Sequence, residues 1–239
     1  MKQRMASSAP RIGFDRFIRT AWIDCALHVR LGEADPTDLE HVLDQAELGK
    51  AARVKTMTVL KKLWLRPSPE LDDLAARCAT VAARGPKSTI PLHWVMAIST
   101  YPFFGKVAEL FGKLSAIQGD CTSSELHRRM SEIYGEREGT YRMTNMVLQT
   151  QADWGALRRA DKRLEKCAQI RVDDSRVAAL LAEAAVRYYG KSLPASSLFS
   201  LPVLHPFKVT ARVAQLTTQS RALELRPNSR GEPLVAIRA

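Results

Sequence analysis

Three polar side chains, Arg142, Asn145 and Gln149, recur at intervals of three and four residues. Residues at that spacing share one face of an α-helix. Arginine can hydrogen-bond both acceptors on a guanine edge, and asparagine or glutamine can pair with adenine in the same way. The spacing therefore fits a helix that reads bases in a DNA groove, and it fits an ordinary solvent-exposed polar face equally well.

Basic side chains surround this segment in the sequence. Contact with a phosphate requires positive charge and little geometry. The basic residues with that potential are Arg128, Arg129, Arg137, Arg158, Arg159, Lys162, Arg163 and Lys166. The same reasoning applies to a sparser group near the C-terminus, which consists of Lys208, Arg212 and Arg230. We expect both groups to contact DNA phosphates.

Two helices are expected to precede the Arg142 helix and support it. Val107, Leu110, Phe111 and Leu114 indicate a core helix that ends at Gly119. Hydroxyl side chains before residue 125 offer N-caps for a second helix over 125–134.

The Arg142 helix itself is expected from about residue 140 to 152. Trp154–Leu157 then indicates entry to a β-strand, and Cys167–Val172 is expected to return as its partner, with the basic residues around the turn. Three helices followed by a basic hairpin are typical of a winged helix, a fold that commonly binds DNA.

The last third of the chain follows a similar order. Apolar residues over 177–188 predict a helix that ends at Gly190, and a short helical segment follows over 194–201. Lys208–Ser220 is predicted to be a helix with Lys208 and Arg212 facing outward. Strands are expected at 222–226 and 234–238, joined by a turn rich in Asn, Ser and Gly.

The first hundred residues predict only helices and no site. The expected helices begin or run at Phe14–Leu27, at Asp35–Thr37, over Lys50–Leu65, from Glu70, and from Ile90 to Tyr101. The sequence thus predicts a mainly α protein with a polar tail at 1–12, an N-terminal helical bundle at 13–101, and winged-helix-like modules at 102–173 and 174–239.

The charge balance favours a polyanionic partner. The 239 residues carry a formal net charge of +11, and each Lys or Arg that meets a phosphate releases condensed counterions. A charge that serves only solubility is the alternative interpretation.

Motifs for catalysis, metals and membranes are missing from the sequence. It contains no Gly-rich phosphate loop, no GxSxG and no HExxH. The cysteines stand far apart, without a CxxC pair, at Cys25, Cys78, Cys121 and Cys167. We therefore expect no catalytic residue, no metal, no cofactor and no membrane contact, and a cytoplasmic location.

Several short motifs resemble the BrxA family of bacterial BREX phage-exclusion systems. They are Gln45–Lys50, the basic helix Arg53–Leu65, Ser68–Leu71, and Met146–Gln149 followed by Trp154–Leu157. The resemblance implies a small, mostly helical, non-enzymatic protein with helix-turn-helix-like parts that binds double-stranded DNA. It also implies that the protein acts beside larger methyltransferase and ATPase components.

The combined expectation is a non-enzymatic double-stranded DNA-binding protein, an accessory component of a phage-defence assembly that contacts other subunits of that complex. Two alternatives stay open. Winged helices also serve as docking modules, so the protein could be an interaction scaffold. Helical bundles with basic faces also bind structured RNA.

Overall fold

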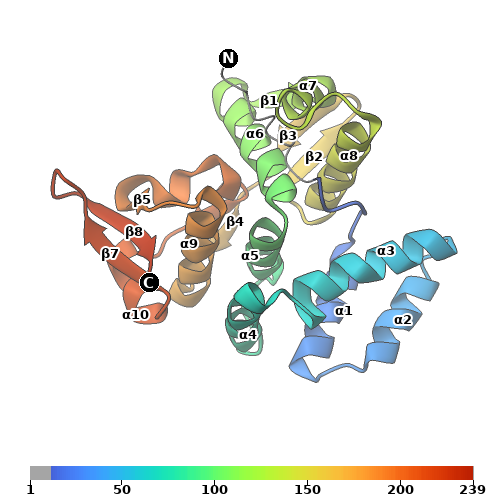
Figure 1. Ribbon diagram of the computed structural model, residues 1–239, viewed down its shortest axis with the longest axis horizontal. Coiled ribbons are helices and arrows are strands. Elements are labelled where there is room, and N and C mark those ends of the chain that lie inside the picture. The colour runs from blue at the N-terminus through green and yellow to red at the C-terminus, as the bar shows by residue number, and fades with distance from the viewer. Residues whose placement is uncertain (1–11, 239) are drawn as a thin grey trace, which may run out of the picture.

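A computed structural model describes residues 12–238 and is mainly helical, with small sheets (Figure 1). The tail expected at 1–12 lies outside the described residues except for Ile12. The α-helices are α1 (Thr20–Leu31), α2 (Pro36–Asp44), α3 (Lys50–Leu60), α4 (Pro69–Ala82), α5 (Ile90–Thr100), α6 (Pro102–Gln118), α7 (Ser123–Tyr134), α8 (Glu138–Asp153), α9 (Ser175–Tyr189) and α10 (Leu216–Gln219). The π-helical and 3-10 segments are Lys61–Leu65, Ala195–Ser200, Pro202–Leu204 and Val213–Gln215. The strands are β1 (Asp120–Thr122), β2 (Leu157–Ala160), β3 (Arg163–Lys166), β4 (Ile170–Val172), β5 (Leu193–Pro194), β6 (Phe207–Val209), β7 (Leu223–Pro227) and β8 (Pro233–Ile237).

Capping side chains fix two of the expected helix starts. Asp35 accepts a hydrogen bond from the backbone N–H of Thr37, while Asp38 accepts from the N–H of Asp35, so α2 begins with a capping box. The hydroxyl of Thr122 accepts from the N–H of Glu125 at 3.1 Å and starts α7. Both starts were predicted from the sequence and are confirmed.

The first helix begins later than expected, at Thr20 and not at Phe14. Phe14 has a φ of 66°, which a helix does not allow. The N–H of Ile18 donates to the hydroxyl of Thr150 at 2.9 Å, and Trp154 Nε1 donates to the carbonyl of Ile18 at 3.1 Å. The segment before α1 is therefore held extended because its backbone groups bond to the end of α8.

The core is organised around α5. Every residue from Ile90 to Ile98 is buried, as expected for a helix that is apolar on all sides. It packs against α6 and α9, and Trp94 Nε1 donates to the carbonyl of Val203 at 3.0 Å. The buried cluster continues across residues 101 and 173, where the sequence suggested boundaries.

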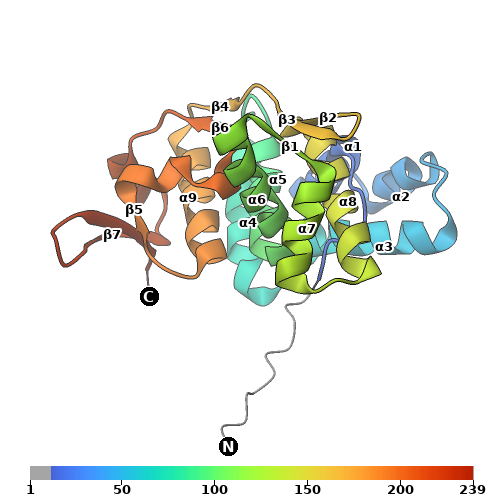
Figure 2. The same ribbon diagram turned by 90° about the horizontal axis from the view of Figure 1, so that it is seen from above.

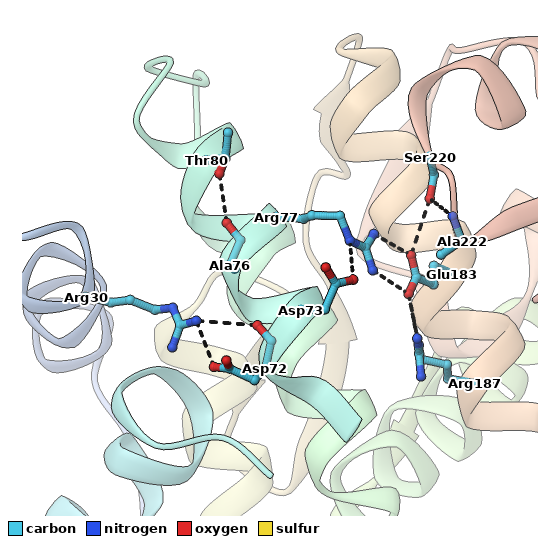
Figure 3. A network of polar contacts seen from close by, with 10 residues as sticks. All are labelled: Arg30, Asp72, Asp73, Ala76, Arg77, Thr80, Glu183, Arg187, Ser220 and Ala222. Atoms are coloured by element: carbon cyan, nitrogen blue, oxygen red, sulfur yellow. Dashed lines mark hydrogen bonds and ion pairs between the residues drawn. The ribbon is translucent and has the colours of Figure 1, made fainter. Parts of the chain in front are cut away.

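A buried carboxylate ties α4 to α9 (Figure 3). The side chain of Glu183 is fully buried and accepts hydrogen bonds from Arg77 at 2.6 and 2.8 Å and from Arg187 at 3.0 Å. Burying a charge is costly unless it is paired and hydrogen-bonded. Here two guanidinium groups from different helices provide that compensation.

The hairpin after α8 has a tighter turn than expected. Only Asp161 and Lys162 separate β2 from β3, and Asp161 adopts the left-handed conformation with a φ of 51°, which aspartate tolerates in two-residue turns. The prediction that Cys167–Val172 pairs back onto the first strand is wrong, because β3 over Arg163–Lys166 takes that place. Instead β4 pairs in parallel with β6, far along the chain.

The prediction of one helix over Lys208–Ser220 is also wrong. Residues 207–209 form β6, and the segment becomes helical only in the 3-10 turn at 213–215 and in α10. The pairing of β6 with β4 and the bond from the Thr210 hydroxyl to Asp173 at 2.8 Å hold the chain extended. Lys208 therefore lies on a strand, and Arg212 lies just before the 3-10 turn.

Two parts of the chain follow a similar order of elements. In the first, α6, β1, α7, α8 and the β2–β3 hairpin follow one another, with sheet order β1-β3-β2. In the second, α9, β5, two 3-10 segments, β6, a third 3-10 turn, α10 and the β7–β8 hairpin follow, with sheet order β5-β8-β7. Strand β6 has no counterpart in the first part. Helices α9, α5 and α6 lie between the β7–β8 hairpin and α8 (Figures 1 and 2).

The length and apolar character of the helices bear on whether the chain can cross a membrane. Within residues 12–238, no helix combines the length and the apolar character that crossing a bilayer requires.

Candidate nucleic-acid interface

Helix α8 presents one polar face to solvent. It buries Thr140, Thr144, Val147, Leu148 and Gln151 against the rest of the fold. On the opposite face Tyr141 and Arg142 are exposed, while Asn145 and Gln149 are half-buried. The helical face predicted from the spacing of Arg142, Asn145 and Gln149 is therefore confirmed, and it faces outward.

The hairpin contributes to the same surface. Arg142, Asn145 and Gln149 line one hollow together with Tyr141 and with Arg159 of β2. Successive side chains of a strand point to opposite faces, so Arg159 faces this hollow while Arg158 points away from it. The structure thus brings together residues of the helix and of the hairpin that the sequence predicted separately.

A second hollow adjoins the first. Arg128 of α7 and Arg137, in the turn before α8, line it. Tyr141 and Glu138 line both hollows. We call the surface around the two hollows the α8 face; its predicted members are Arg128, Arg137, Arg142, Asn145, Gln149 and Arg159.

Four of the predicted phosphate contacts already have carboxylate partners. Arg128 pairs with Glu132, Arg129 with Glu125, Arg158 with Glu165, and Arg163 with Asp120. The carboxylates offset the charge that these arginines can offer to an anion. Asp120 accepts two hydrogen bonds from Arg163, one of them from Nε at 2.7 Å.

The other predicted cations of this region are free. Among residues 12–238, no carboxylate lies within ion-pairing distance of Arg137, Arg142, Arg159, Lys162 or Lys166. All five are exposed. Lys162 lies in the two-residue turn at the tip of the hairpin, so positive charge extends from the α8 face onto the hairpin.

Two aromatic residues support the face, and the sequence reasoning missed both. The ring of His127 stacks on Tyr141 at a centroid distance of 4.0 Å, and His127 Nε2 lies 3.3 Å from Asn145 Oδ1. Burial lowers the pKa of His127, and the positive charge of Arg159 lowers it further, so the ring is neutral at pH 7. The spacing of Tyr141 from Asn145, four residues, could have revealed Tyr141, whereas His127 is brought there only by the packing of α7 on α8.

The predicted cations of the second part of the chain do not form a comparable surface. Lys208 lies on β6, Arg212 before the 3-10 turn, and Arg230 in the turn between β7 and β8. All three are exposed. They occupy three different elements and no helical face unites them.

The buried histidine His93 forms hydrogen bonds within the core through both ring nitrogens. His93 accepts a hydrogen bond from Trp64 Nε1 at 3.1 Å and donates from Nε2 to Asp24 at 2.8 Å. Burial acts to raise the pKa of Asp24, but the bonds from His93 and Thr89 outweigh it and the pKa is lowered. Both ring nitrogens of His93 are thus occupied, so this Asp–His pair holds the core together.

The cysteines and carboxylates do not gather into a metal site within the part of the chain that the structure describes. The four cysteines are unpaired thiols there. Burial raises the pKa of Cys121 to about 12 and also raises that of Cys78, which keeps both thiols protonated and unreactive.

Comparisons with known proteins do not assign this arrangement of residues to a family or fold. No family model, curated protein or solved structure matches the chain.

Proposed function

We propose that the protein binds double-stranded DNA through the α8 face, and that residues 102–166 act as a winged-helix-like module. Support comes from the order of elements. A helix, a strand, two further helices and a hairpin follow one another, and the first strand pairs with the last. In helix-turn-helix proteins the later helix of the pair enters the major groove while the earlier one crosses the backbone, which assigns these roles to α8 and α7.

The dimensions of α8 suit this role. Its 16 residues make a helix about 24 Å long, and the major groove admits a helix. Arg142 and Gln149 are separated by about 10 Å along the axis, which matches about three base-pair steps. Asn145 and Gln149 then face the base edges, and Arg142, at one end of the row, lies within reach of the phosphates beside Tyr141.

The observation that carries the proposal is the joining of unpaired cations from two elements around one hollow. Arg142 comes from the helix and Arg159 from the hairpin, and Lys162 extends the charge to the hairpin tip. Free cations on a helix and an adjacent hairpin can contact phosphates on both sides of a groove. Few side chains are placed to read bases, so we expect binding that depends strongly on salt and weakly on sequence.

The biological setting that we propose rests on the sequence resemblance to the BrxA family. The protein would be a non-enzymatic accessory component of a bacterial phage-defence assembly, in contact with other subunits of that complex. Its own contribution would be to hold the assembly on duplex DNA.

A salt titration of binding to a random-sequence duplex tests the DNA proposal. Arg142→Ala combined with Arg159→Ala should make the plot of log K against log salt shallower by about 1.8 units, because each lost phosphate contact contributes about 0.9. The matched control is Lys191→Ala with Arg221→Ala, which removes the same charge from two exposed positions and should leave the slope unchanged.

Two results would overturn the proposal. One is the absence of binding at low salt, which would favour the scaffold alternative. The other is displacement of the duplex DNA by an equal concentration of duplex RNA, which would favour RNA as the partner.

A further inference from the structure

The N-terminal helices surround an open hollow of about 700 Å³ that shares no residue with the α8 face. Residues of α1, α2, α3, the π-helical segment and α4 line it. The hollow is therefore formed by the packing of the N-terminal helices against one another. It is larger than either hollow of the α8 face.

The floor of the hollow is apolar. Its apolar residues are Val29, Leu39, Met57, Leu65, Ala76 and Ala79. Leu39 and Ala79 are buried beneath it, whereas Val29, Met57 and Leu65 are only half-buried and Ala76 is exposed. Apolar area left half-covered at the base of a groove gains free energy when a partner excludes water from it.

The π-helical turn determines which side chains line one wall of the hollow. Met57, Lys61 and Leu65 all line the hollow at four-residue intervals. In an α-helix of 3.6 residues per turn such a row drifts around the axis. The wider turn over Lys61–Leu65 offsets that drift, so Leu65 returns close to the line of Met57, with Lys61 beside them on the same wall.

The rim of the hollow is positively charged. Lys61 and Arg66 are exposed, and among residues 12–238 no carboxylate lies within ion-pairing distance of either. Arg30 also lines the hollow, where it donates to the carbonyl of Trp64 at 2.8 Å and pairs with Asp72 at 3.0 Å. Glu40 is the single acidic residue of the lining, so positive charge is in excess.

We propose that this groove docks an amphipathic helix of a partner protein, with acidic residues on both sides of its apolar stripe. The apolar floor receives the stripe, as in other helix-in-groove complexes, and Lys61 and Arg66 pair with the flanking acids. Duplex DNA has no apolar surface to cover the half-buried floor, which separates this groove from the α8 face. The inference is independent of the proposed DNA binding.

A synthetic peptide provides the probe. The peptide is a fluorescent four-turn helix with leucine at positions i, i+3, i+4 and i+7 and glutamate beside them, and its twin has lysine in place of every glutamate. With the full-length protein, fluorescence anisotropy should give the acidic peptide a Kd of about 10–100 µM. The basic twin should bind at least about tenfold more weakly because it meets Lys61 and Arg66 with like charge.

Variants locate the binding. Lys61→Glu with Arg66→Glu should weaken the acidic peptide at least about tenfold. Ala76→Trp should weaken it similarly by filling the groove from an exposed position. The matched control is Lys50→Glu with Lys62→Glu, which reverses two exposed charges outside the lining and should change the Kd less than about twofold.

Three outcomes would overturn the inference. The first is an acidic peptide that binds no tighter than its basic twin. The second is binding that survives both groove variants. The third is displacement of the peptide by duplex DNA, which would assign Lys61 and Arg66 to a nucleic-acid surface.

Discussion

Residues 102–166 and 175–237 share the strand order of their three-stranded sheets and both end in a hairpin, yet only the first part presents a long polar helix. The helix that precedes the final hairpin is α8 in the first part, with 16 residues, and α10 in the second, with four. In the second part the preceding chain forms β6, which pairs with β4. A shared framework therefore does not imply a shared surface.

The two parts also use their charges differently. Both parts bury a paired carboxylate, Glu109 with Lys106 and Lys113 in the first and Glu183 with Arg77 and Arg187 in the second. Only the first also gathers cations that lack a carboxylate partner within residues 12–238 around one hollow, namely Arg142 and Arg159. Unpaired cations at the surface are available to an anion, but a buried ionic network is fully engaged within the fold. The cations gathered on the α8 face support the proposal that the first part is the DNA interface, while the Glu183 network holds α9 against α4.

The largest effect should come from Glu183→Gln. The change leaves Arg77 and Arg187 without their buried partner, which should lower the free energy of unfolding by about 3 kcal/mol, the lower end of the usual range because both arginines keep some contact with water. Chemical denaturation measures the change. Asp73→Asn is the control, since the carboxylate of Asp73 is 80% exposed, and its effect should stay below about 1 kcal/mol. An equal loss in both variants would contradict a structural role for the second part.

Replacing Gly112 tests how closely α6 packs against the Pro202 segment. A Cβ at Gly112 of α6 would lie 2.2 Å from the carbonyl oxygen of Pro202, so Gly112→Ala should destabilise the protein by about 1–3 kcal/mol. At Gly139 of α8 a Cβ meets no atom within 4 Å, and Gly139→Ala should stabilise it by up to about 1 kcal/mol. Thermal unfolding distinguishes the two. A neutral Gly112→Ala would mean that α6 and the Pro202 segment can move apart.

A half-buried histidine, His205, should make this junction sensitive to acid. Burial, together with the smaller effect of the positive charge of Lys166, lowers the pKa of His205 to about 3. Below about pH 6.5 the imidazole of His205 is protonated in the unfolded chain but stays neutral in the folded protein. The free energy of unfolding should therefore fall as the pH decreases from about 6.5 towards 3, by about 2 kcal/mol at pH 5. His205→Phe keeps the ring contacts with Trp94 and Phe111 and should flatten the curve by that amount. Urea unfolding at pH 7 and pH 5 measures it, and an unchanged pH dependence would contradict the assignment.

The sequence predicted the first part better than the second because its signals are local. The N-cap at Thr122 acts over three residues, and the polar face of α8 follows from the helical spacing of Arg142, Asn145 and Gln149. Both agree with the structure. The missed residue His127 reaches Asn145 only through the packing of two helices, which spacing alone does not encode.

The errors arise where distant segments decide the local structure. Phe207–Val209 is extended because it pairs with Ile170–Val172, and nothing near residue 207 reveals that partner. The segment before Thr20 is held by Thr150 and Trp154 from the far end of α8. The second hairpin was predicted correctly, since the turn between β7 and β8 carries its own signal in Asn228 and Gly231.

The most direct test of the comparison removes three positive charges from each part in turn and measures how duplex DNA binding depends on salt. Arg142, Arg159 and Lys162 changed to alanine should make the slope of log K against log salt shallower by about 2.7 units. Lys208, Arg212 and Arg230 changed to alanine remove the same net charge and should leave the slope within about half a unit of the wild type. Equal losses in the two variants, or a larger loss in the second, would contradict the assignment of DNA binding to the α8 face.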